Sequence, residues 1–111
     1  MKCLSVPVNA VTIERLEYDE CMDDDLIEVF LDESDYKKLW DTGVLTLINE
    51  KLGKNIDDYE DEGIIGLNDL YQAQAITKET ILFNPGDDIL NKLLSQINLA
   101  IKFNTGIFFF F

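Results

Sequence analysis

Residues 84–111 read NPGDDILNKLLSQINLAIKFNTGIFFFF, and this stretch decides the fold class. Its first five residues are a helix-initiation signal, in which Asp87 and Asp88 complement the helix dipole. The residues that follow predict a helix over 87–103, because apolar side chains recur at helical spacing: Ile89, Leu90, Leu93, Leu94, Ile97, Ala100 and Ile101. Asn104-Thr105-Gly106 ends this helix, and the apolar run 107–111 predicts a buried strand. A helix followed by a buried strand indicates that helices pack on a sheet.

Two more strands are predicted near the start of the chain. Residues 26–31, LIEVFL, are short, rich in β-branched and aromatic side chains and bounded by acidic residues, which is typical of a buried strand. Residues 3–8 predict another strand, which Pro7 confines to a sheet edge or to a strand end.

A helical region is predicted over 35–52, with Ser34 as its N-cap and Gly53 as its C-cap. Gly43 lies inside this region and costs about 1 kcal/mol relative to alanine, so two short helices joined there are the alternative. Trp40 occupies a core-like position of the pattern and is predicted to be buried.

The middle of the chain is less regular. Gly63 and Gly66 predict a loop or turn, and Asn68 predicts the N-cap of a helix that extends through about Ile76. Residues 80–83 are predicted to be extended at best. Together these segments predict one α+β domain over 1–111, with three to four helices packed with a small sheet of two to four strands.

The charge of the chain is strongly negative and unevenly distributed. There are 22 acidic residues against 9 basic ones, for a formal net charge of -13. Eleven of the acidic residues fall within 14–35 and five within 57–62. Such a field repels nucleic acid, attracts basic partners and mildly favours a monomer. We therefore expect a cationic protein as partner, and neither a nucleic acid nor a membrane.

Most catalytic and metal-binding arrangements are excluded by the residue types. The chain has no histidine and no Gly-rich phosphate loop. Residues 58–69 follow the spacing of a calcium loop, but glutamates at the third and fifth places and Asp69 at the twelfth fit the ion poorly. Carboxylate clusters such as 23–25 are predicted to be solvated surface. No catalytic, cofactor-binding or metal-binding residue is therefore predicted, and the protein is expected not to be an enzyme.

Cys3 and Cys21 form no metal-binding or redox motif and are predicted to be reduced structural thiols. The first residues lack the apolar run of a signal peptide, and no stretch has the roughly 20 apolar residues of a membrane helix. A cytoplasmic protein is expected.

The acidic run at 57–62 is the first candidate for a recognition site, because it is contiguous, borders glycines and contains Tyr59, an aromatic residue of the type that anchors interfaces. The predicted partner-binding residues are Asp57, Asp58, Tyr59, Glu60, Asp61 and Glu62, followed by Asp23, Asp24, Asp25, Asp32, Glu33 and Asp35.

Three segments carry a resemblance to a known class of proteins. Leu39-Trp40, residues 47–51 (LINEK) and residues 55–62 (NIDDYEDE) are similar to immunity proteins of bacterial contact-dependent growth inhibition systems. The resemblance implies a small, acidic, cytosolic protein that neutralises the toxin domain of a neighbouring cell's large secreted protein, commonly a nuclease. Charge supports the same function independently, because a nuclease is cationic where it holds phosphates and an acidic inhibitor can occlude that surface.

We therefore expect an immunity protein that blocks a cationic toxin, with a ribonuclease favoured. The alternative is a phage-encoded acidic DNA mimic that inhibits a nucleic-acid-binding defence protein, of the anti-restriction or anti-CRISPR type. A toxin gene immediately upstream favours the first function, and a phage setting favours the second.

Overall fold

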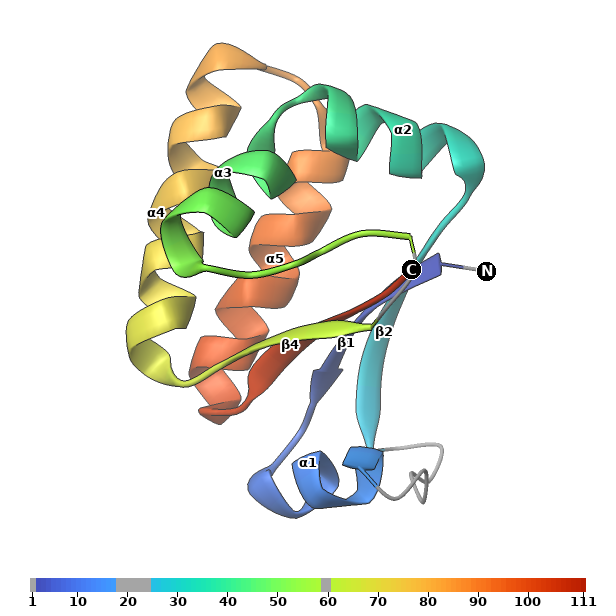
Figure 1. Cartoon of the computed structure of the whole chain (residues 1–111), viewed down its shortest axis with the longest axis vertical. Coiled ribbons are helices and arrows are strands. Elements are labelled where there is room, and N and C mark those ends of the chain that lie inside the picture. The colour runs from blue at the N-terminus through green and yellow to red at the C-terminus, as the bar shows by residue number, and fades with distance from the viewer. Residues whose placement is uncertain (1, 18–24, 59–60) are drawn as a thin grey trace.

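The computed structural model describes residues 2–17, 25–58 and 61–111, without the side chains of residues 14–17. Within them the chain forms an α+β fold, in which four strands make one antiparallel sheet (Figure 1). The elements in chain order are β1 (Lys2–Pro7), α1 (Ala10–Glu17), β2 (Leu26–Leu31), α2 (Glu33–Asp41), α3 (Val44–Leu52), β3 (Glu62–Ile65), α4 (Leu67–Phe83), α5 (Asp88–Phe103) and β4 (Gly106–Phe110). The predicted fold class is confirmed, with five helices among the described residues rather than three to four.

The sheet has the strand order β2-β1-β4-β3, so the first and last strands of the chain lie side by side at its centre. The predicted strands at 26–31 and 107–111 are confirmed, but β2 lies at a sheet edge and is only half-buried, with Glu28 and Phe30 exposed. Pro7 is the last residue of the central strand β1, where its missing N–H is tolerated.

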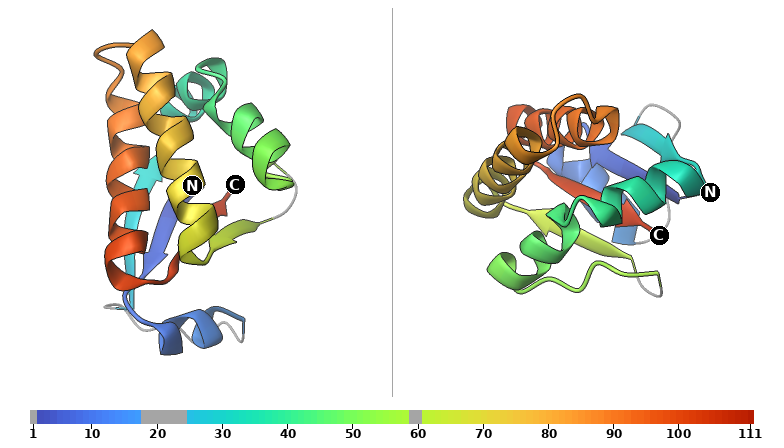
Figure 2. Two further views of the ribbon diagram at one scale, coloured as in Figure 1. Left: turned by 90° about the vertical axis from the view of Figure 1, so that its left-hand side faces the viewer. Right: turned by 90° about the horizontal axis from the view of Figure 1, so that it is seen from above.

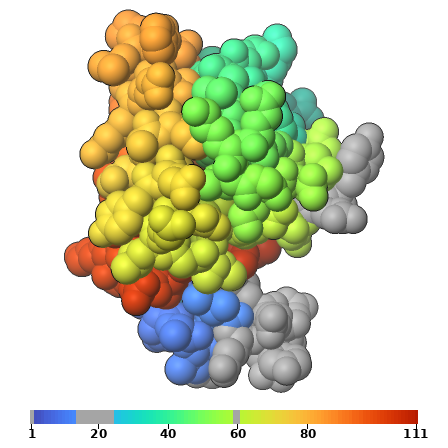
Figure 3. Space-filling model, turned by 60° about the vertical axis from the view of Figure 1, so that its left-hand side comes forward, coloured from blue at the N-terminus to red at the C-terminus, as the bar shows by residue number. Residues whose placement is uncertain are grey.

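Helices α4 and α5 pack together, and α5 covers β1 and β4 on one face of the sheet (Figure 2). Helix α3 packs on α4, and the two form one continuous surface (Figure 3). Helix α2 crosses the end of the sheet where both termini lie, and α1 lies at the opposite end (Figure 1). No helix among the described residues is long and apolar enough to cross a membrane.

The region predicted as one helix over 35–52 is two helices, which confirms the alternative of a break at Gly43. Gly43 has φ 83°, a left-handed conformation that favours glycine; it follows Thr42, the C-cap of α2, and is the N-cap of α3. The predicted cap Ser34 is wrong. Asp32 is the N-cap of α2, because its carboxylate accepts from the Asp35 backbone N–H at 2.7 Å while Asp35 bonds back to the Asp32 N–H.

Two predictions for the middle of the chain are also wrong. Residues 62–65 form β3 instead of a loop, and residues 80–83 belong to α4, which begins after Gly66 rather than at Asn68. The hydroxyls of Thr77 and Thr80 are buried in α4 and donate to carbonyls one turn earlier, at 2.8 Å each. Helix α4 can therefore bury these polar side chains without leaving a donor unsatisfied.

Helix α5 confirms the predicted helix at 87–103. Asp87 caps it, and Asn104 ends it in the left-handed conformation with φ 52°. Its inner side contains one polar residue, Gln96, whose amide donates to the carbonyls of Leu4 and Ile27 at 2.9 Å each. Gln96 therefore fixes α5 against both β1 and β2.

The two faces of the sheet differ sharply. Leu4, Val6, Ile64, Ile107 and Phe109 point into the helical layer and are fully buried. The other face, which we call the outer face, carries the alternate residues of each strand: Cys3, Ser5, Glu28, Phe30, Gly63, Ile65, Phe108 and Phe110. Among the described residues, the hydrophobic core therefore forms on the helical side of the sheet.

Candidate partner-binding surface

The predicted recognition residues lie in three places. Asp25 begins β2, Asp32, Glu33 and Asp35 lie at the start of α2, and the acidic run from Asp57 leads into β3. Four of the predicted residues, Asp23, Asp24, Tyr59 and Glu60, lie outside the described residues.

The sequence predicted that Asp25 would lie on a solvated surface, and this prediction is wrong. It is 8% exposed, and its carbonyl accepts from the Val8 N–H at 3.0 Å. This bond extends the pairing of β1 with β2 by one step, which draws Asp25 into the fold.

The three acidic residues of α2 lie in or next to its first turn. Asp32 and Asp35 are engaged in the capping box, and Glu33 is exposed between them. Carboxylates are favourable there because the helix dipole is positive at this end. Their negative charge can therefore be displayed at little cost to the fold.

Asp58 is bound to residues that are remote in the sequence. Its Oδ1 accepts a short hydrogen bond from the Tyr36 hydroxyl and lies 3.4 Å from Lys2 Nζ. Lys2 also donates to the Phe111 carbonyl at 3.0 Å and lies over the Tyr36 ring, 4.4 Å from its centre. The first strand, the last strand, α2 and the acidic run therefore meet at this end of the sheet.

This convergence brings two of the predicted acidic segments together. A groove of about 590 Å³ there is lined by Lys2, Leu31, Asp32, Glu33 and Phe111. The start of α2 and both ends of the chain lie close together in Figure 1. We call the residues Asp32, Glu33, Asp35, Asp57, Asp58 and Asp61 the acidic end of the molecule. Lys2 also lies there, and its amine contacts Asp58.

The hydrogen bond between Tyr36 and Asp58 affects the titration of both groups. Partial burial, together with this bond, raises the pKa of Tyr36 to about 12. The bond from Tyr36 lowers the pKa of Asp58, and Lys2 adds to the effect. Tyr36 is thus a hydrogen-bond donor, and Asp58 an ionised acceptor, throughout the neutral range.

We expect one of the four tyrosines to titrate near pH 12 when absorbance at 295 nm is followed. Because unfolded tyrosine ionises near pH 10, the stability contributed by neutral Tyr36 is fully present below pH 10. It is lost as the pH rises from about 10 to about 12. The variant Tyr36→Phe should remove this late step, and Tyr71→Phe, at an exposed tyrosine, should not. Four tyrosines that titrate together near pH 10 would contradict the contact.

The last residues of the acidic run lie beside the outer face. A groove of about 290 Å³ is lined by Asp61 and Glu62, by Ile13 of α1, and by Gly63, Ile65, Phe108 and Phe110. Glu62 also accepts from the backbone N–H groups of Asn55 and Gly63. The run therefore connects the acidic end with an aromatic surface.

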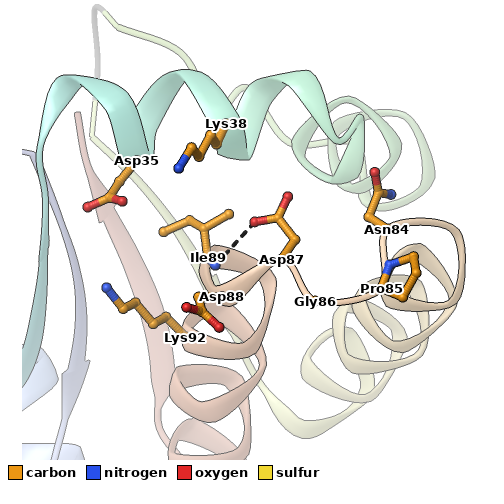
Figure 4. Close-up of a pocket in the computed structure, with 9 residues that line it drawn as sticks. All are labelled: Asp35, Lys38, Asn84, Pro85, Gly86, Asp87, Asp88, Ile89 and Lys92. Carbon is orange, nitrogen blue, oxygen red and sulfur yellow. Dashed lines mark hydrogen bonds between the residues drawn. The ribbon is translucent and has the colours of Figure 1, made fainter.

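A third groove, of about 560 Å³, lies between α2 and the start of α5 (Figure 4). Asp35 and Lys38 come from α2, and Asp87, Asp88 and Lys92 come from the α5 side. The Asp87 carboxylate accepts from the Ile89 N–H at 3.4 Å, so it serves as a helix cap. The lining is mostly polar and of mixed charge, unlike the apolar lining of most small-molecule sites.

Residues 58–69, whose spacing follows that of a calcium loop, include strand β3 and the first residues of α4. Within the described parts of the chain, no three acidic or cysteine side chains are grouped so as to hold a metal ion.

Sequence reasoning missed the aromatic residues of the outer face. Phe108 and Phe110 were predicted to be buried, but they are partly exposed and their rings stack with centres 6.2 Å apart. Phe30 is 56% exposed. The alternation of side chains along a strand could have indicated this, because a run of five apolar residues places rings on both faces of a sheet.

The described residues form a small α+β protein with an acidic end and a sheet face that carries exposed aromatic side chains. Comparisons of the chain with protein families, with curated proteins and with solved structures found no significant match.

Proposed function

We propose that the protein is an immunity protein that binds a cationic toxin domain and neutralises it by stoichiometric occlusion. The observation that carries this proposal is the acidic end, where Lys2 contacts Asp58 of the run before β3 and lines one groove with Asp32 and Glu33 at the start of α2. A surface of this kind is complementary to the phosphate-binding surface of a nuclease.

The action is binding and not catalysis, and its place is the cytoplasm, where an incoming nuclease would reach its substrate. A ribonuclease is the first candidate for the toxin. Electrostatic attraction would accelerate capture, toward about 10⁸ M⁻¹s⁻¹ at low salt, before the toxin acts.

Co-expression tests this function directly. Where a large secreted protein is encoded next to this chain, the chain is produced together with that protein's C-terminal domain, and growth and complex formation are measured. We expect growth rescue and a 1:1 complex that weakens as salt is raised. No complex and no rescue would contradict the proposal, and binding to a defence complex that holds DNA would indicate the DNA-mimic alternative.

A further inference from the structure

The outer face of the sheet contains one carboxylate among aromatic rings. Glu28 lies opposite Ser5, and Phe108 lies on the far side of Ser5. One step along the strands, Phe30 and Phe110 flank Cys3 in the same way. Glu28 and Phe30 therefore face Phe108 and Phe110 across β1, at a separation of about 10 Å set by two strand spacings.

The small residues of β1 form the floor between these side chains. Ser5 Oγ donates to Glu28 Oε2 at 3.2 Å, and Cys3 Sγ donates to the same oxygen at 3.5 Å. Burial raises the pKa of the Cys3 thiol, so at neutral pH it keeps the proton that it donates. These two donors fix the position of the Glu28 carboxylate.

Glu28 nevertheless retains acceptor capacity. Glu28 is exposed. Among the described residues, no hydrogen bond reaches its second carboxylate oxygen, Oε1, and no lysine or arginine forms an ion pair with it. A carboxylate has about four acceptor sites, of which two are in use here. The described part of the outer face contains no positive charge to neutralise it.

We propose that the outer face binds an arginine side chain of the protein partner, with its guanidinium paired to Glu28 and packed against Phe30 and the Phe108–Phe110 pair. An arginine fits this surface better than a lysine, because the guanidinium is planar, weakly hydrated and stacks on aromatic rings. Apolar residues beside that arginine would cover Phe30 and Ile65, which are 56% and 48% exposed. The inference rests on the proposed function only in taking the toxin domain as this partner.

A probe that does not depend on the toxin tests the surface itself. The ¹⁵N-labelled full chain is titrated with a pentapeptide of alternating leucine and arginine, and with the same peptide carrying neutral citrulline in place of arginine. We expect the arginine peptide to shift the amide signals of Ser5, Glu28, Phe30 and Phe108, and the citrulline peptide to bind about 10-fold more weakly.

The variant Glu28→Gln keeps an acceptor for Ser5 and Cys3 but removes the charge, so it should abolish the preference for arginine. Glu79→Gln, at an exposed carboxylate of α4, is the matched control and should leave the preference intact. Equal binding of the two peptides, or shifts confined to the acidic end, would overturn the inference.

The toxin complex supplies the second test. We expect Phe30→Ala and Glu28→Gln each to raise Kd by about 10-fold, mainly through faster dissociation. Phe83→Ala, at a phenylalanine that is 79% exposed on α4, should change Kd less than about twofold. If the toxin binds and all these variants bind alike, the outer face is not the docking surface, whereas the proposed function stands. If the arginine peptide binds to the outer face but the toxin domain does not bind the chain, the outer face is an arginine-binding surface and the proposed function is wrong.

Discussion

Replacement of Phe109 by alanine is expected to lower the free energy of unfolding by about 3–5 kcal/mol, the usual cost of truncating a buried phenylalanine. Phe109 is fully buried, lies at the centre of the sheet beside Leu4 and points into the helical layer. A loss of this size is a large part of the stability of a small domain, and here it adds to the self-repulsion of a net charge of -13.

The neighbouring residue provides a matched control. Phe110 lies on the outer face and is partly exposed, so Phe110→Ala should cost only about 1 kcal/mol. Urea unfolding followed by the fluorescence of Trp40, the single tryptophan, which packs against the core, measures both variants. Equal losses for the two variants would contradict the assignment of one buried face and one open face.

The contrast between Phe109 and Phe110 also marks the limit of prediction from this sequence. Residues 107–111 have no polar alternation, so the apolar run identifies a strand but not the face to which each ring points. That information comes from the partner strands, since the register with Leu4 and Ile64 places Phe109 and Ile107 inside.

Helix α5 was predictable because its apolar positions repeat over four turns and its ends carry clear signals in Asp87 and Asn104. The second half of α4 was not. Thr77, Thr80 and Ile81 are β-branched and favour extended structure locally, but packing against α5 and the hydroxyl bonds to earlier carbonyls outweigh that preference.

Strand β3 was predicted as a loop because it contains Gly63. The structure explains the glycine differently. A Cβ at this position would lie 2.7 Å from the ring of Phe108, so the absence of a side chain lets the ring pack over the strand. A glycine that accommodates a neighbour across the sheet cannot be distinguished from a turn glycine in a single sequence.

The candidate surface was only partly predictable. The sequence identified the acidic segments, because charge is read directly from composition. It could not indicate that Tyr36 and Lys2, which are 22 and 56 positions from Asp58, would bind that carboxylate. Nor could it separate Asp25, which the fold buries, from Glu33, which the fold displays.

This distinction determines how the electrostatic mechanism should be tested. Reversal of Asp58 would remove the bond to Tyr36 and place a cation against Lys2, so it would disturb the fold as well as the surface. Asp61 and Glu33 are exposed and are better choices. A lysine at Glu33 opposes the dipole of α2 at a cost of about 0.3–1 kcal/mol, which leaves the fold intact.

The double variant Glu33→Lys with Asp61→Lys is expected to slow association with the toxin domain by about 10- to 100-fold at low salt, because both changes fall on the acidic end, the surface proposed to bind the toxin. Glu50→Lys with Glu79→Lys is the matched control, since it changes the net charge equally through exposed carboxylates of α3 and α4. Stopped-flow association at several salt concentrations should show a much smaller effect for the control pair, less than about 3-fold, and a flatter salt dependence for the first pair. Equal slowing by both pairs would mean that the toxin responds to the total charge of the molecule, and would contradict recognition at the acidic end.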